Sequence, residues 1–303
     1  MKLISRTHGF SAAPAGRRAF TLIELLVVIS IIALMTGLIV AGTMRFKDSQ
    51  VVATTDAQVT RFQQALDTDY KQVVQKCQKE GPPAAVQAFC GGNDDRARAV
   101  HTAATLRINF PETFAEATTA FDIGGFAYRP QSLFKSVAAS SGASAEEQRA
   151  VLLFLILTER ATAGGTGNDM GSPGERRTTK VGGADLTYFI DLYGTPIVYS
   201  RWAQNTELNA PPFTPASPIS KDPLDPKNLV ATWSESGPPV NTAKRDYLRS
   251  SKTDGTLPNL VFNGENRVPT VVSAGKNKAF NSFGGDDRVG YRLARFGAKG
   301  DGK

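Results

Sequence analysis

The sequence has few of the residues on which enzyme active sites depend. It contains 2 histidines and 2 cysteines in 303 residues. His8 lies in the N-terminal leader, which leaves His101 as the one histidine for a nucleophile–base pair, and no GxSxG, HExxH or CxxC pattern accompanies it. The glycine-rich stretch 164–177 contains neither a GxxxxGK[ST] nor a GxGxxG phosphate loop. We therefore expect a protein that is not an enzyme.

A nucleic-acid-binding pattern is also lacking. The net charge of +7 owes much to residues 1–19, which hold four basic side chains and no acid. The remaining chain has 31 basic and 28 acidic residues, a net charge of +3. It shows neither a basic stripe interleaved with aromatics nor a zinc-finger or RNP pattern. We expect no nucleic-acid partner.

One long hydrophobic run is present, from Phe20 to Ala41. As a helix its 22 residues span roughly 33 Å, which matches the hydrocarbon core of a bilayer. The rest of the chain has a globular composition, with 41% hydrophobic and 21% charged residues overall. Arg17 and Arg18 precede the run, so we expect a cytoplasmic N-terminus and an exported C-terminal part. An uncleaved signal anchor is the simplest interpretation of this pattern.

A plain anchor does not explain Glu24, because an ionisable group in a membrane helix is costly and marks a functional site. The stretch AFTLIELLVVISIIALM resembles the N-terminal motif of type IV prepilins and type II secretion pseudopilins. The resemblance implies that prepilin peptidase cuts between Ala19 and Phe20 and methylates the new Phe20 amine. It also implies that Glu24 neutralises the Phe20 ammonium of a neighbouring subunit. Ala19 stands where the family usually has glycine.

The expected fold is α+β and pilin-like, with a long N-terminal transmembrane helix packed on a C-terminal antiparallel β-sheet domain. We expect a leader at 1–19, a helix over 20–79 that spans the membrane at 20–42, and an exported domain at 80–303. An apolar stripe supports the outer half of the helix; it consists of Val59, Phe62, Leu66, Tyr70 and Val73. Residues 81–143 read as irregular, and 164–177 as a flexible surface loop.

Two further segments predict regular structure. Ser144 and Glu147 form a capping-box pattern ahead of an apolar run, which predicts a buried helix. Residues 186–202, LTYFIDLYGTPIVYSRW, predict two strands joined by a turn at 193–196, a hairpin in which Asp191 caps the turn. This segment is similar to the D-x-W-G-x-P segment of pseudopilins, including long ones from planctomycete-like bacteria.

The C-terminal stretch PTVVSAGKNKAFNSFGGDDRVGY predicts a strand followed by a loop. It resembles the calcium loop of major pseudopilins, which implies a calcium site formed by Ser273, Asn277, Asp286 and Asp287. Asn277 replaces the usual aspartate, and neighbouring lysines add positive charge. Both a calcium site and a metal-free turn remain open.

Cys77 and Cys90 flank a Gly-Pro-Pro turn, and no partner with metal-ligand spacing accompanies them. In an oxidising compartment they can form a disulfide. The alternative is two free thiols buried in the core.

The resemblance implies a pseudopilin that assembles at the bacterial inner membrane, as a single-pass protein with a periplasmic C-terminal domain. Its implied partners are prepilin peptidase, other pseudopilin subunits and the inner-membrane secretion platform that drives protein export. The alternatives are a fibre-forming type IV pilin and an anchored exported protein outside any filament.

Overall fold

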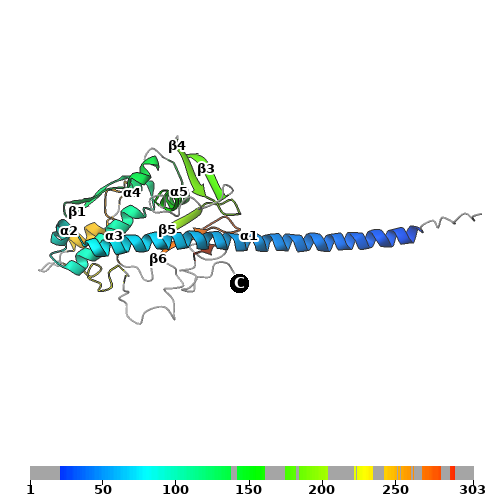
Figure 1. The fold of residues 1–303 in the computed structure, drawn as a ribbon, viewed down its shortest axis with the longest axis horizontal. Coiled ribbons are helices and arrows are strands. Elements are labelled where there is room, and N and C mark those ends of the chain that lie inside the picture. Colours follow the sequence, from blue (N-terminus) through cyan, green and yellow to red (C-terminus); the bar gives the residue numbers. More distant parts are fainter. Residues whose placement is uncertain are drawn as a thin grey trace, which may run out of the picture. The chain divides into compact units, whose positions relative to one another are not determined.

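The computed structural model describes residues 21–137, 142–160, 175–181, 184–203, 222, 224–234, 242–250, 252, 254–260, 262, 268–280 and 287–290. The expected loop at 164–177 therefore lies largely outside the described residues. The chain divides into two units, residues 1–50 and 51–303 (Figure 1). Helix α1, Leu22–Glu80, contributes to both, so the long N-terminal helix expected from the sequence is present.

In the first unit α1 is exposed along its whole length. Apolar side chains dominate this half of the helix. Gly37 and Gly42 do not interrupt it, because one glycine costs a helix only about 1 kcal/mol relative to alanine.

In the second unit α1 packs the predicted stripe against the core, with Tyr70 and Val73 half-buried. Val59, Phe62 and Leu66 are at most 1% exposed, and the Phe62 ring stacks on Phe189 with centroids 4.3 Å apart. The helix ends at a glycine with a left-handed backbone, Gly81 (φ 72°), whose N–H donates to the carbonyl of Cys77.

Residues 81–143 are largely regular, so the expectation of an irregular region was wrong. They form α2 (Ala84–Phe89), α3 (Asp94–Asn109), α4 (Phe114–Thr118), the short hairpin β1 (Phe121–Ile123) and β2 (Phe126–Tyr128), and η1 (Ser132–Val137). Alanine is the best helix former, and several alanines of α3 are buried, which lets neighbouring elements approach closely. Asn93 caps α3 by accepting the N–H of Arg96.

The predicted buried helix is confirmed as α5, Ala145–Leu155, which continues into a π-helical turn, Ile156–Arg160. Its capping box is complete: the hydroxyl of Ser144 accepts the Glu147 N–H, and the Glu147 carboxylate accepts the Ser144 N–H. The apolar side chains of α5 contact β4 and β5.

The strands form small antiparallel sheets. One pairs β3 (Arg176–Val181) with β4 (Ala184–Phe189), and another has the order β5 (Ile197–Ala203), β6 (Val268–Ser273), β7 (Arg288–Val289). The predicted strands and turn within 186–202 are present, and an antiparallel bridge from Ile190 to Pro196 and a bond from the Asp191 N–H to the Thr195 carbonyl close the turn as in a hairpin. The pairing does not continue beyond this turn, because β4 and β5 belong to different sheets.

Helix α1 is fixed to the second of these sheets by a buried amide. Gln63 Nε2 donates to the carbonyl of Pro269 at 2.9 Å, and Gln63 Oε1 accepts the Val271 N–H at 2.8 Å. Gly290 passes so close that a Cβ there would overlap the Gln63 side chain. A side chain at position 290 would therefore require the Gln63 side chain to shift and to give up its hydrogen bonds to β6.

Two hydrophobic clusters fill the second unit. The first joins α1, α5 and strands β4 to β6, and the second joins α2, α3 and the β1–β2 hairpin to Trp233, Leu248 and Phe262. The short helix α6, Ala243–Arg249, borders the second cluster through Leu248. The observed fold is α+β, as the sequence predicted.

Candidate functional site

The first turn of α1 holds Glu24 in a reciprocal contact with Thr21. The N–H and hydroxyl of Thr21 donate to Glu24 Oε2 at 2.9 and 3.0 Å, and the Glu24 N–H donates to Thr21 Oγ1 at 3.3 Å. This is the geometry of a capping box, which satisfies donors at a helix start. Glu24 therefore has a local partner before any second subunit is considered. Ala19 and Phe20 lie outside the described residues, so cleavage and methylation there stay predictions.

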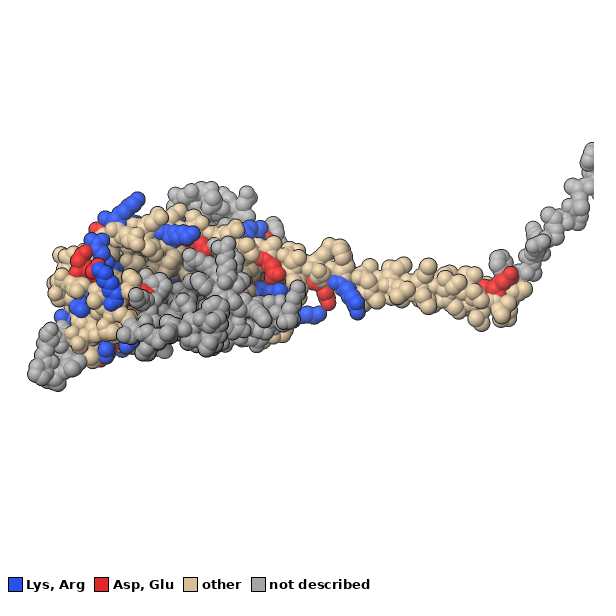
Figure 2. Space-filling model, turned by 90° about the horizontal axis from the view of Figure 1, so that it is seen from below, with Lys and Arg blue, Asp and Glu red and all other residues tan. Residues whose placement is uncertain are grey.

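Beyond Glu24 the helix surface is apolar. Residues 25–44 include no charged side chain, and the large hydrophobic side chains of this stretch are exposed. In Figure 2 they form an unbroken tan segment without blue or red atoms. An apolar surface of this extent requires cover by lipid or protein.

The hydroxyl groups of this segment are satisfied within the helix. Ser30 donates to the carbonyl of Leu26 at 2.8 Å, and Thr36 donates to that of Ile32 at 2.7 Å. In hydrocarbon an unsatisfied polar group costs several kcal/mol, so this pattern suits a membrane helix. Among the described residues, α1 is the one helix long and apolar enough to cross a bilayer. Its length and composition support membrane anchoring.

In the second unit, Asp191 joins two segments that are distant in the sequence, the 191–195 turn and the end of β6. Its Oδ1 accepts the N–H groups of Tyr193 and Thr195, each at 2.9 Å, so it caps the turn as predicted. Its Oδ2 accepts the hydroxyls of Thr195 at 2.5 Å and Ser273 at 2.6 Å. Ser273 in turn accepts the Gly275 N–H. The carboxylate is 3% exposed and fixes the 191–195 turn to the end of β6.

The residues expected to bind calcium have other contacts in this structure. Ser273 is fully buried and donates to Asp191, and Asn277 Oδ1 accepts the Ala279 N–H at 2.8 Å. Asp287 is fully buried, and Asp286 lies outside the described residues. Nowhere in the described part of the chain do three His, Cys, Asp or Glu side chains form a group that could hold a metal ion. Ser273 and Asn277 do not fit a calcium site as folded, and calcium binding stays a prediction.

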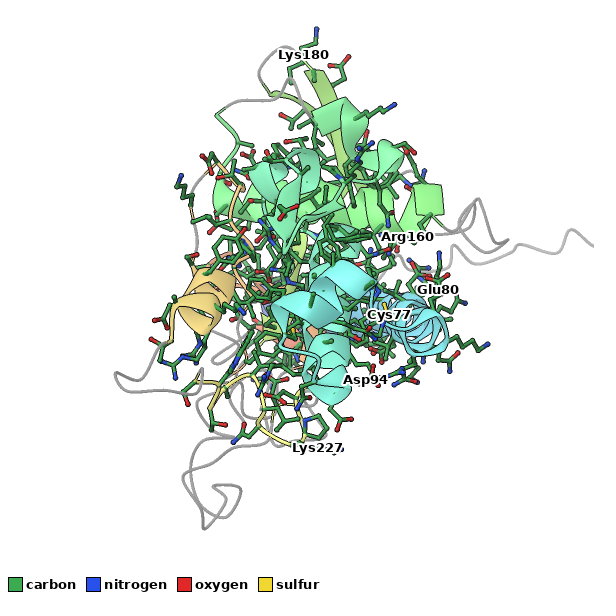
Figure 3. All side chains as sticks on the ribbon, turned by 90° about the vertical axis from the view of Figure 1, so that its left-hand side faces the viewer. Cys77, Glu80, Asp94, Arg160, Lys180 and Lys227 are labelled. Atoms are coloured by element: carbon green, nitrogen blue, oxygen red, sulfur yellow. The ribbon has the colours of Figure 1, made fainter. Side chains whose placement is uncertain are left out.

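Both cysteines are free and buried, so the structure has the two buried thiols that were one of the alternatives, and no Cys77–Cys90 disulfide. Figure 3 shows Cys77 on the side of α1 that faces the domain. Burial raises the pKa of both thiols, that of Cys90 to about 11. Near them, His101 Nδ1 shares a hydrogen bond of 2.8 Å with the buried Tyr128 hydroxyl, and burial lowers the pKa of His101. This histidine packs at an aromatic contact within the domain.

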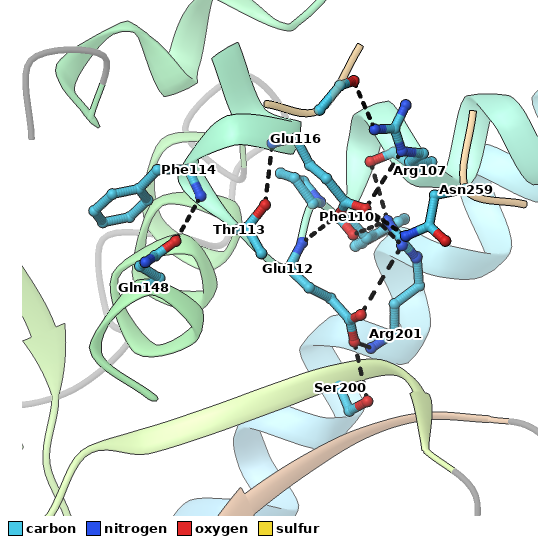
Figure 4. A network of polar contacts seen from close by, with 12 residues as sticks. Arg107, Phe110, Glu112, Thr113, Phe114, Glu116, Gln148, Ser200, Arg201 and Asn259 are labelled. Atoms are coloured by element: carbon cyan, nitrogen blue, oxygen red, sulfur yellow. Dashed lines mark hydrogen bonds and ion pairs between the residues drawn. The ribbon is translucent and has the colours of Figure 1, made fainter. Parts of the chain in front are cut away.

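Sequence reasoning missed a buried ionic network, shown in Figure 4. Arg107 from α3 and Arg201 from β5 are each 2% exposed, and both contact the carboxylate of Glu116 on α4. Glu112 accepts the Arg201 N–H at 2.7 Å. Arg107 and Arg201 are 94 positions apart, and Asn259, which donates to Glu116, is 143 positions from it, so no local pattern signals the network.

Electrostatics keep the network ionised. Burial alone would raise the pKa of the Glu116 carboxyl, but the charges of Arg201 and Arg107 and the Glu112 N–H outweigh burial and hold the pKa at about 2. Burial lowers the pKa of Arg107, and the charge of Glu116 opposes that shift. Removing one partner would leave a buried charge unpaired, which typically costs about 3 to 5 kcal/mol.

Residues 14–40 match the family model of the prokaryotic N-terminal methylation motif. No curated protein and no solved structure matches the chain.

The motif and the long apolar helix that follows it are consistent with a type IV pilin-like protein. The motif implies processing by prepilin peptidase and assembly with pilin-like subunits. Proteins that carry it in this setting are structural and not enzymatic.

Proposed function

We propose that the protein is a pseudopilin, a structural subunit of a type II secretion pseudopilus that assembles in the inner membrane and drives protein export. The observation that carries the choice of the secretion branch is the bond between Asp191 and Ser273. It joins the two segments, DLYGTP and SAG, that resemble pseudopilins beyond the N-terminal motif. In this proposal the exported domain is periplasmic, and the inner-membrane secretion platform adds the subunits.

Glu24 would set the register of assembly. Without a charge, an apolar helix packs on its neighbours at many axial offsets, whereas a carboxylate that seeks an ammonium favours one offset, as a buried polar residue does in a coiled coil. The contacts of Glu24 support this role. Both Thr21 bonds are made to Oε2, and among the described contacts Oε1 accepts none. One oxygen is therefore available to the Phe20 amine of the next subunit.

Processing is tested by intact-protein mass spectrometry. In cells that contain prepilin peptidase, the mature chain should begin with N-methylated Phe20. A chain that retains Met1 in those cells would contradict the proposal at its first step.

Assembly is tested with Glu24→Gln. Glutamine serves at this capping-box position as glutamate does, so the helix start is kept while the charge is lost. We expect the variant to insert in the membrane, to lose its subunit crosslinks and to stop export of secreted proteins. Normal crosslinking by Glu24→Gln would show that capping, and not charge, explains the residue.

The same strains distinguish the alternatives. A fibre-forming pilin would appear in fibres sheared from the cell surface, and its loss would leave secretion unchanged. An anchored protein outside any filament would give no subunit crosslinks even with Glu24 intact.

A further inference from the structure

A cavity of about 410 Å³ lies beside the buried ionic network. Its walls come from α3, α4, α5 with the two residues Gly142 and Ala143 ahead of it, and from Lys252 and Asn259. Its polar lining includes Arg107, Glu116, Gln148, Lys252 and Asn259. Figure 4 shows four of these residues, with Gln148 on α5 across from the Arg107–Glu116 pair. All of them belong to the exported part of the chain.

The side-chain oxygens of Glu116 and Gln148 in this lining already accept hydrogen bonds. Glu116 Oε1 accepts from Arg107 Nε at 3.3 Å and Arg201 Nη2 at 3.4 Å, and its Oε2 accepts from Arg201 Nη1 at 3.2 Å and the Glu112 N–H at 3.0 Å. Gln148 Oε1 accepts the Phe114 N–H at 2.9 Å. A ligand that donates hydrogen bonds would find these oxygens already in use.

Two hydrogen-bond donors at the cavity, in contrast, have no acceptor among the described residues. Arg107 Nη1 is buried and has no hydrogen-bond partner in the described structure. Lys252 is exposed at the same cavity, and the nearby Asp254 carboxylate accepts from Thr256. With Glu112, Arg201 and Asp254, whose carboxylate interacts electrostatically with Lys252, the charged groups of the cavity and its surroundings sum to zero. The unpaired Arg107 N–H group and the Lys252 ammonium are donors, so they favour a group that only accepts hydrogen bonds and carries negative charge.

We propose that this cavity binds a carboxylate on a short apolar stem. The carboxylate accepts from Arg107 and Lys252, and the stem lies against Phe114 and Ala143, which also line the cavity. The ligand is either a small free organic acid or an acidic side chain of a partner protein. Both sources present the same chemistry to the cavity.

The test uses the full-length protein in detergent micelles, with thermal unfolding followed by tryptophan fluorescence. Sodium propionate is compared with propionamide, a neutral molecule of nearly the same shape, at matched chloride and ionic strength. Ligand that binds only the folded state raises the Tm, and we expect a rise of about 2 to 4 °C with saturating propionate. Propionamide should give none.

Lys252→Gln and Lys180→Gln form the matched pair of variants. Both lysines are exposed, but Lys180 lies on β3 and does not line the cavity (Figure 3). Loss of one exposed ionic contact weakens binding by about threefold to fivefold, so Lys252→Gln should need correspondingly more propionate and Lys180→Gln should not. Equal shifts with propionate and propionamide, equal responses of the two variants, or no shift with propionate would overturn the proposal.

A peptide-binding experiment distinguishes the two possible sources of the carboxylate. A short peptide with a central glutamate is compared with the same peptide carrying glutamine. Tighter binding of the glutamate peptide than of propionate assigns the cavity to a partner's side chain. Binding of propionate alone assigns it to a free acid.

Discussion

Gln63 on α1 contacts β6 as a neighbouring strand would. Its side-chain amide donates to the carbonyl of Pro269 and accepts the N–H of Val271, two residues further along the strand. A third bond, from Nε2 to Asp67 Oδ1 at 3.0 Å, holds the amide in this orientation. The helix and sheet are thus joined by backbone-like hydrogen bonds as well as by apolar packing.

Replacing Gln63 with alanine should destabilise the domain strongly. The change leaves a buried N–H and a buried carbonyl of β6 without partners, and each such group costs about 1 to 3 kcal/mol. We expect the free energy of unfolding to fall by about 3 kcal/mol, measured by urea denaturation with tryptophan fluorescence. Gln64→Ala is the control, because Gln64 is exposed on the same helix turn. Similar midpoints for the two variants would refute the assigned role.

The Glu116 network predicts a specific loss of stability in acid. The pKa of Glu116 is about 2 in the folded protein, against an ordinary value of 4.5. A carboxyl with a depressed folded pKa contributes its full stability above the unfolded pKa, and the contribution is lost as pH falls toward the folded value. We therefore expect about 3 kcal/mol to disappear between about pH 4.5 and 2.

Denaturation midpoints measured across that pH range check this expectation. Glu146→Gln is the control, since Glu146 is exposed on α5 and its removal should leave the slope unchanged. In Glu116→Gln the slope over this window should be reduced, whatever the stability of that variant at neutral pH. An unchanged slope in Glu116→Gln would mean that other carboxyls cause the acid loss.

The candidate calcium ligands that remain are the carboxylates of Asp286 and Asp287 and backbone carbonyls, because the Ser273 hydroxyl already donates to Asp191. Calcium takes six to eight oxygen ligands, and extracellular sites bind it with Kd values of about 0.1 to 1 mM. We expect the Tm to be a few degrees higher in about 10 mM calcium than in EDTA.

Two variants separate metal binding from folding in this loop. Asp286→Asn with Asp287→Asn should abolish the difference between the buffers. Ser273→Ala should lower the Tm in both buffers and keep the difference. Identical melting of the unmutated protein in calcium and EDTA would leave the metal-free turn as the correct description.

The two cysteines should react slowly with alkylating reagents in the native protein. Only the thiolate reacts quickly, and burial both shields the thiols and raises their pKa. Mass spectrometry after iodoacetamide treatment should show no alkylation of the native chain and two adducts after unfolding without reductant. A mass lower by two hydrogens, with no adducts, would show the Cys77–Cys90 disulfide instead.

Local patterns in the sequence predicted the elements they encode. The spacing of Val59, Phe62 and Leu66 gave the buried face of α1, and Ser144 with Glu147 gave the start of α5. Each of these signals lies within one or two helix turns. Asp191 likewise caps a turn formed by its immediate neighbours.

Strand pairing and buried charges were not predictable in this way. The partner of β5 is β6, some seventy residues later, and nothing within 186–202 excludes the local hairpin that the sequence suggested. Arg107, Glu116 and Arg201 look like ordinary surface charges until the fold brings them together. Alanine-rich 81–143 was misread because small residues show weak apolar periodicity even when they are buried.

The close approach of Gly290 to Gln63 also constrains how this protein can change during evolution. A side chain at 290 would displace Gln63 from its hydrogen bonds to β6, and a shorter residue at 63 would remove those bonds. Neither position can vary alone without loss. Among homologues that descend from this gene, Gln63 and Gly290 should therefore be conserved together or substituted together.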